Sequence, residues 1–153
     1  MKRLLLILSF VVVSIWACAQ EETRIVDSFE SVLPTQQGRE KVETMIELSK
    51  AFFDFSFDDC INWGEKAIEE AEKMNDNQLT AIAYGEIGIH YLNHYEFDLS
   101  KRSFENAETL LADGIDSILL TDVLNYLGRV ELFMGDLDLA LSTFQHDLEL
   151  SKA

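Results

Sequence analysis

Two histidines and a glutamate in the middle of the chain are the residues best spaced for metal binding. Glu86, His90 and His94 follow one another at intervals of four, so a helix presents all three on one face. Three ligands along one straight helix span about 12 Å, however, at a rise of ~1.5 Å per residue. His90 is also not followed by the glutamate that serves as the base in a zinc hydrolase helix. We therefore expect ordinary histidines of a polar or partly buried face and no metal site, with weak binding by two of the three as the alternative.

Aspartates gather in two further segments and offer oxygen ligands. The two groups are Asp54, Asp58 and Asp59, and Asp113, Asp116 and Asp122. A calcium loop needs alternating oxygen ligands, a central glycine and a closing glutamate at fixed spacing, and neither segment has that pattern. Both groups are therefore predicted to be turn and helix-start residues.

The sequence contains none of the familiar catalytic arrangements. It has no glycine-rich phosphate loop, no serine nucleophile elbow with histidine and aspartate, and no Cys-x-x-Cys pair. Cys60 lies among apolar residues at helical spacing, which is typical of a buried small side chain. We predict that the protein is not an enzyme and needs no cofactor.

A repeat of 40 residues organises most of the chain. Gly88, Ser100 and Phe104 recur as Gly128, Ala140 and Phe144, and Cys60 lies 40 residues before Ser100. Three units result, at about 39–76, 77–115 and 116–153. They are preceded by a short helix and a linker at 20–38, in which Pro34 ends the helix. In each unit large and small residues recur three and four residues apart, the spacing of one helix face, in two successive segments. The prediction is an all-α array of about three antiparallel helix pairs, without a sheet.

The alternation of small and large residues has a packing reason. Gly88 and Gly128 let the two helices of a pair approach closely, and Phe104 and Phe144 fill the space between successive pairs. These residues resemble the tetratricopeptide repeat. The second unit carries the best match, Tyr84-x-x-Ile87-Gly88-x-x-Tyr91 followed by Ser100, Phe104 and Ala107. The third unit departs with Glu131 in place of the tyrosine, and the period exceeds the usual ~34 residues.

The resemblance implies a concave groove, lined by the first helix of each pair, that holds a peptide or a partner helix. The positions it assigns to the groove are Ile46, Lys50, Phe53, Ile82, Glu86, Ile89, Leu92, Asn93, Asn125, Arg129, Leu132 and Phe133. Ile82, Ile89 and Leu92 form one stripe that the pair itself does not need, which is typical of a binding strip or of packing on neighbouring repeats. We expect a protein or peptide partner.

The charge balance excludes some partners. The chain has 12 Lys and Arg against 28 Asp and Glu. Binding to nucleic acid requires a basic patch, and docking on an anionic membrane requires basic clusters, so neither is expected.

The first 19 residues have the pattern of an export signal. Lys2 and Arg3 precede an apolar run that is too short to span a membrane, and small residues around Cys18 suit a signal peptidase. We expect an exported, periplasmic protein without a membrane span after cleavage. The alternative is a lipoprotein anchored through Cys18.

Leu141, Leu148 and Leu150 near the end of the last unit are expected to need cover, since repeat arrays usually carry a polar cap. They would find it in a homodimer or in the remainder of a longer chain. In the second case the array would resemble the extracytoplasmic sensor part of an envelope signalling protein.

Overall fold

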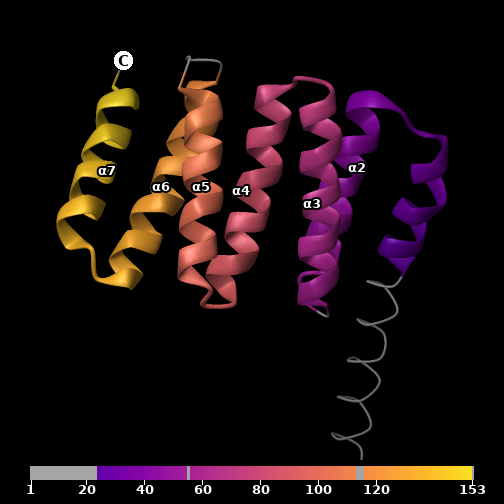
Figure 1. The fold of residues 1–153 in the computed structure, drawn as a ribbon, viewed down its shortest axis with the longest axis horizontal. Helices are drawn as coiled ribbons and strands as arrows, with labels where there is room; N and C mark the ends of the chain where they lie inside the picture. The colour runs from indigo at the N-terminus through magenta and orange to yellow at the C-terminus, as the bar shows by residue number, and fades with distance from the viewer. Residues whose placement is uncertain (1–23, 55, 113–115, 153) are drawn as a thin grey trace, which may run out of the picture.

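The computed structural model describes residues 24–54, 56–112 and 116–152, and these residues form helices joined by short turns (Figure 1). A helix over 24–32 leads into a 3-10 turn, η1. The α-helices that follow are α2 (Gly38–Ala51), α3 (Phe57–Lys73), α4 (Asn77–Asn93), α5 (Phe97–Leu111), α6 (Ser117–Met134) and α7 (Leu137–Leu150). No strand occurs in the described part of the chain. The all-α prediction is confirmed, and the helices form three pairs, one in each predicted unit.

The helix ends follow from the turn residues between them. Asp76 and Asp116 precede α4 and α6, and their carboxylates accept hydrogen bonds from the backbone N–H groups of the first turn, at 3.0 Å from Leu79 and Leu119. Such caps satisfy N–H groups that the helix itself leaves unpaired. At the other end of α6, Gly135 has φ 88°, a left-handed conformation that suits glycine. The prediction that the aspartates lie at turns and helix starts is confirmed at Asp116 but is wrong for Asp122, which lies within α6.

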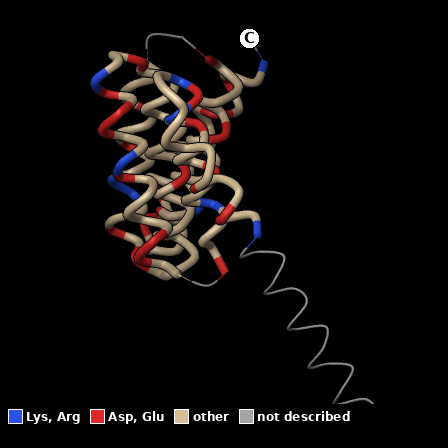
Figure 2. The backbone as a smooth tube through the Cα atoms, turned by 90° about the vertical axis from the view of Figure 1, so that its right-hand side faces the viewer, with Lys and Arg blue, Asp and Glu red and all other residues tan. Residues whose placement is uncertain are grey.

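The helices form two rows. Helix α4 contacts α2 and α6, so the first helices of the pairs lie side by side, whereas α3, α5 and α7 do not contact one another. Helices α3 and α5 each pack between two first helices, whereas α7 stands at the end of the array with only α6 beside it (Figure 1). Acidic positions are scattered over the length of the helices and outnumber the basic ones (Figure 2).

The small residues of the repeat produce close contacts within each pair. The Ser100 hydroxyl donates to the Gly88 carbonyl at 2.8 Å between α5 and α4, and the Ser49 hydroxyl donates to the Cys60 carbonyl at 2.7 Å between α2 and α3. Phe104 is buried against Gly88 and stacks on Tyr126 of α6, with ring centroids 5.4 Å apart. The predicted role of Phe104, to fill the space between successive pairs, is confirmed.

The α-helix over 24–32 ends just before Pro34, as expected, and Pro34 lies inside η1 (Leu33–Thr35). Leu141 and Leu148 are exposed as expected, but Leu150 is partly buried against the core. Within the described ranges no helix is long and apolar enough to cross a membrane. The predicted signal and Cys18 lie outside the described residues.

Candidate functional site

A pocket of about 270 Å³ opens on the row of first helices, between α4 and α6. Three of the predicted groove residues, Ile82, Glu86 and Ile89, line it from α4. Asp122 and Tyr126 line it from α6. The pocket therefore combines apolar walls with two carboxylates from different helices. Gly85 lies between the α4 side chains and leaves the space open, since a Cβ atom at this position would have no neighbour within 4 Å.

A chain of polar contacts runs from the surface beside this pocket into the core. The ammonium group of Lys50 lies 2.9 Å from Glu47 and 3.9 Å from Glu86. The other Glu86 oxygen is 3.5 Å from His90 Nε2, and this nitrogen is 3.1 Å from the Ser49 hydroxyl. Burial raises the pKa of Glu86, Lys50 lowers it and Glu47 raises it further.

The hydrogen bonds assign the protonation state of His90. The single hydroxyl proton of Ser49 is donated to the Cys60 carbonyl, so Ser49 Oγ accepts from His90, and Nε2 carries the proton. The other ring nitrogen, Nδ1, is buried and has no partner among the described residues. A second proton would therefore have no acceptor. Burial, assisted by His94 and Lys50, lowers the pKa of His90 to about 4, and the ring is neutral at pH 7.

The buried histidine predicts a loss of stability in acid. Between pH 6.5 and pH 4 the unfolded chain binds a proton at His90 that the folded chain excludes, so stability falls as the pH falls through this window. The loss from this side chain is about 3 kcal/mol at ~1.4 kcal/mol per pH unit. His90→Gln should remove that part of the pH dependence in urea unfolding series at pH 7, 5.5 and 4.5.

His146→Gln is the matched control, because His146 is exposed on α7 and is not among the groups that shift the pKa of His90. The raised pKa of Glu86 opposes the effect of His90, since the folded state then binds a proton there more readily. The change in the free energy of unfolding with pH is therefore compared between each variant and the parent protein. An equal pH dependence in parent and His90→Gln would contradict the assignment.

The structure separates His94 from the other two residues that were considered for a metal. His90 is 1% exposed and bonded to Ser49, whereas His94 lies at the surface with its ring stacked on Phe57 at 3.9 Å. The described residues contain no group of three or more His, Cys, Asp or Glu side chains arranged to hold a metal ion. Cys60 is also buried, and burial raises the pKa of its thiol to about 11, which disfavours the reactive thiolate.

Two predicted groove residues are not on the groove surface. Ile46 and Leu92 are buried in the two halves of the core, Ile46 in the cluster that contains Leu79 and Leu92 in the cluster that contains Leu124. The expected continuous apolar strip is therefore interrupted at Leu92. The physical reason is that α4 is covered by helices on four sides, so more than one stripe of its surface is buried.

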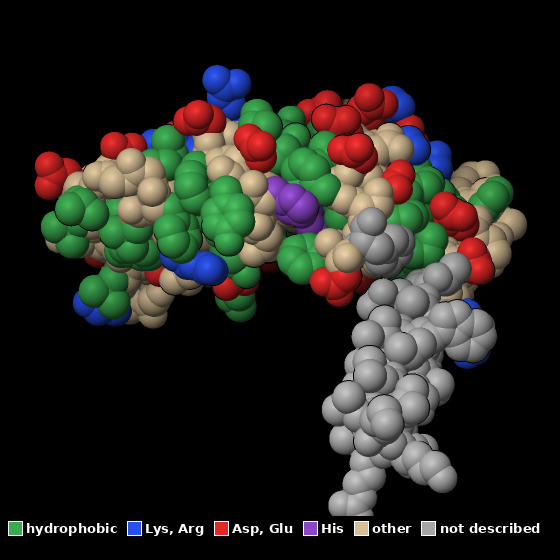
Figure 3. Space-filling view, turned by 90° about the horizontal axis from the view of Figure 1, so that it is seen from below, with side chains coloured by type: hydrophobic (Ala, Val, Ile, Leu, Met, Phe, Trp, Pro, Cys, Tyr) green, Lys and Arg blue, Asp and Glu red, His purple; other side chains and the backbone are tan. Residues whose placement is uncertain are grey.

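The remaining groove residues lie at the surface around the pocket or at one edge of the array. Arg129 lies over the Tyr126 ring at 5.0 Å, and Asn93 donates to the Ile89 carbonyl. Asn125 and Leu132 are exposed. Phe53 and Phe133 lie close to the turns that join the helices of their pairs, an edge where hydrophobic side chains gather (Figure 3). Phe133 stacks there on Phe97 of α5, at 5.7 Å between centroids.

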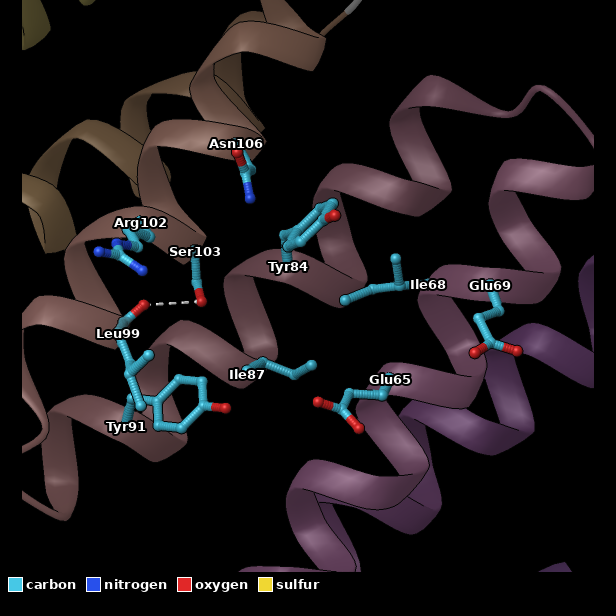
Figure 4. A pocket seen from close by; sticks show the side chains of 10 residues that line it. All are labelled: Glu65, Ile68, Glu69, Tyr84, Ile87, Tyr91, Leu99, Arg102, Ser103 and Asn106. Carbon is cyan, nitrogen blue, oxygen red and sulfur yellow. Dashed lines mark hydrogen bonds between the residues drawn. The ribbon is translucent and has the colours of Figure 1, made fainter.

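A second pocket, of about 480 Å³, lies on the opposite face and was missed from the sequence (Figure 4). Tyr84 and Tyr91 of α4 line it together with Glu65 and Glu69 of α3. The far wall is formed by α5 and carries Arg102. Burial, with Glu65 and Glu96 nearby, raises the pKa of Tyr91. The sequence signal that could have indicated this pocket is the i, i+4 spacing of Glu65 and Glu69 on one helix and of Arg102 and Asn106 on another.

The fold is an all-α array of helix pairs with a pocket on the row of its first helices. A search of family models found no match, and no curated protein matched. Among solved structures, the chain is similar to BtubC (BKLC) from P. vanneervenii, with a TM-score of 0.79 at 16% sequence identity. The match covers 87% of this chain and 57% of BtubC, so the chain spans little more than half of that protein's length. At this identity the likeness shows the fold alone.

Proposed function

We propose that this protein is an exported protein–protein interaction module of the tetratricopeptide type, which binds a segment of a partner protein without catalysing a reaction on it. The three helix pairs in register and the tetratricopeptide-like pattern of the second unit support the family. The pattern of an export signal that the sequence carries at residues 1–19 supports the location. The observation that carries the binding role is the pocket between α4 and α6, which lies where the repeat pattern assigns the groove.

The walls of the pocket indicate the chemistry of the bound segment. Ile82, Ile89 and Tyr126 provide apolar contact, and Glu86 and Asp122 place two carboxylates at the same pocket. Lys50 pairs with Glu47 and approaches Glu86, but no ion pair of Asp122 occurs in the described structure. The best ligand is therefore a short segment with one apolar side chain for the pocket and a Lys or Arg beside it for Asp122.

The glycine in the pocket wall allows a test that leaves the fold intact. The Cβ atom of Gly85→Leu would meet no neighbour within 4 Å, and the substitution replaces a poor helix former with a good one, so the leucine side chain should occupy the pocket while the helix is kept. Peptides are first selected against the parent protein from a displayed library. Gly85→Leu should then weaken their binding by about tenfold or more, and Asp122→Asn should weaken those that carry a basic residue.

The control is Asn106→Leu, which alters the second pocket on the opposite face. Affinities are measured by fluorescence anisotropy, with thermal unfolding of each variant alongside. If selected peptides bind Gly85→Leu as well as the parent but lose affinity for Asn106→Leu, the binding face is the one shown in Figure 4 and the proposal is wrong.

A further inference from the structure

Helix α7 carries an apolar stripe on the side that faces away from the array. Leu137, Leu141, Phe144 and Leu148 are spaced by four, three and four residues and therefore share one face. The three leucines are 65%, 58% and 53% exposed, respectively. In Figure 1, α7 is the end helix, and no described helix lies on its outer side.

The preceding unit shows what fits such a face. Forty residues earlier, the corresponding positions on α5 are covered by α6: Phe97 stacks on Phe133, and Phe104 stacks on Tyr126. The start of α5 thus meets the end of α6, so the covering helix runs antiparallel to the covered one. Leu137 and Phe144 occupy the places of Phe97 and Phe104. The outer face of α7, called the seat below, is therefore a surface on which one more antiparallel helix could pack.

The differences between the two faces specify the occupant. Lys101 of α5 lies 3.8 Å from the buried carboxylate of Glu131 in α6, but the corresponding residue of α7 is Leu141. An apolar residue, not an acid, therefore suits the seat at that point. Beside the stripe, Asp138 and Glu149 are exposed. They lie about three turns apart along α7 but on the same side of it, within about 20° of rotation around the helix axis. These carboxylates favour lysine or arginine on the occupant.

The same charges disfavour a second copy of this chain. If two α7 helices paired antiparallel along their stripes, each would bring the same flank against the other. Asp138 of one copy would then lie near Glu149 of the other at both ends of the contact, where like charges repel. We propose that the outer face of α7 binds an amphipathic helix of a different protein, with an apolar stripe flanked by basic residues. This surface is separate from the pocket between α4 and α6.

Two synthetic peptides copied from α6 test this proposal. Both span residues 117–134 with Glu131→Leu and keep the side chains that contact α5, Tyr126 and Phe133. The positions of α6 that are exposed in the structure, other than Phe133, carry lysine in one peptide and glutamate in the other. Binding to the full chain is measured by fluorescence anisotropy, and the mass of the chain by sedimentation. The lysine peptide should bind at one per chain, and the glutamate peptide at least about tenfold more weakly.

Variants of α7 locate the binding. Leu141→Asp combined with Leu148→Asp should weaken binding of the lysine peptide by about tenfold or more. Leu139→Asp should leave it unchanged, because Leu139 is similarly exposed but lies on the other side of α7. Circular dichroism checks that each variant is folded. The proposal is wrong if the parent does not bind the lysine peptide, if the double variant binds it equally well, or if the glutamate peptide binds as tightly. A parent dimer that the double variant abolishes would overturn it in favour of self-association.

Discussion

Replacing Lys101 with methionine should destabilise the protein by about 3 kcal/mol, although Lys101 lies close to the surface. The reason is its partner. Glu131 of α6 is 2% exposed, and its carboxylate has two neighbours, the Thr143 hydroxyl at 2.8 Å and the Lys101 ammonium at 3.8 Å. Without the ammonium group, a carboxylate remains buried with a single hydrogen bond. Removing one member of a buried ion pair typically costs ~3–5 kcal/mol, and we expect the lower end because Lys101 is partly solvated.

A double variant separates this effect from loss of packing. Lys101→Met combined with Glu131→Leu removes both charges, and its free energy of unfolding should return close to that of the parent, since exchanging a buried ion pair for apolar residues is often neutral or stabilising. Urea unfolding at pH 7 measures both variants. Lys73→Met is the control for an exposed lysine, which pairs with Glu70 at the surface and should cost far less than Lys101→Met. A loss of the same size for Lys73→Met and Lys101→Met would refute the argument.

Glu131 also shows where the repeat pattern stops being informative. The period of 40 correctly placed the helix pairs and the glycines at the close contacts within them, because both depend on residues of the same repeat unit. The pattern marked Glu131 only as a departure from tyrosine. Its partners lie on two different helices, Lys101 on α5 and Thr143 on α7, and only the packing of those helices brings them to one carboxylate.

Only some of the predicted groove residues line the pocket, for a similar reason. The repeat assigns faces to helices, and three residues that it assigned to the groove, Ile82, Glu86 and Ile89, line the pocket between α4 and α6. It treated the groove side of α4 as one free stripe, however, whereas α4 contacts both α2 and α6 in addition to its neighbours in the other row. Leu92 is buried in the core for this reason. How far a helix is enclosed depends on the angle between repeats, which the sequence pattern does not specify.

Two glycines three residues apart on α4 should respond to alanine in opposite ways. At Gly88 a Cβ atom would lie 2.9 Å from the tip of the Phe104 ring, closer than carbon atoms approach. The ring cannot easily move, because it is buried and stacked on Tyr126. At Gly85 the same atom would meet nothing within 4 Å. The two substitutions gain the same helix propensity, ~1 kcal/mol, so the difference between them isolates the contact.

Gly85→Ala should therefore raise the free energy of unfolding by about 0.5–1 kcal/mol, and Gly88→Ala should lower it by about 1–3 kcal/mol, the usual cost of forcing a methyl group into a packed core. Gly128→Ala adds a test of the mechanism. Its Cβ atom would lie even closer to a ring, 2.7 Å from Phe144, but Phe144 belongs to the end helix α7 and is only partly buried. That ring can turn toward solvent, so Gly128→Ala should cost less than Gly88→Ala in the same urea titrations. If Gly128→Ala proved the more damaging of the two, distance alone would govern the cost, and the pinning of Phe104 between α4 and α6 would not be its cause.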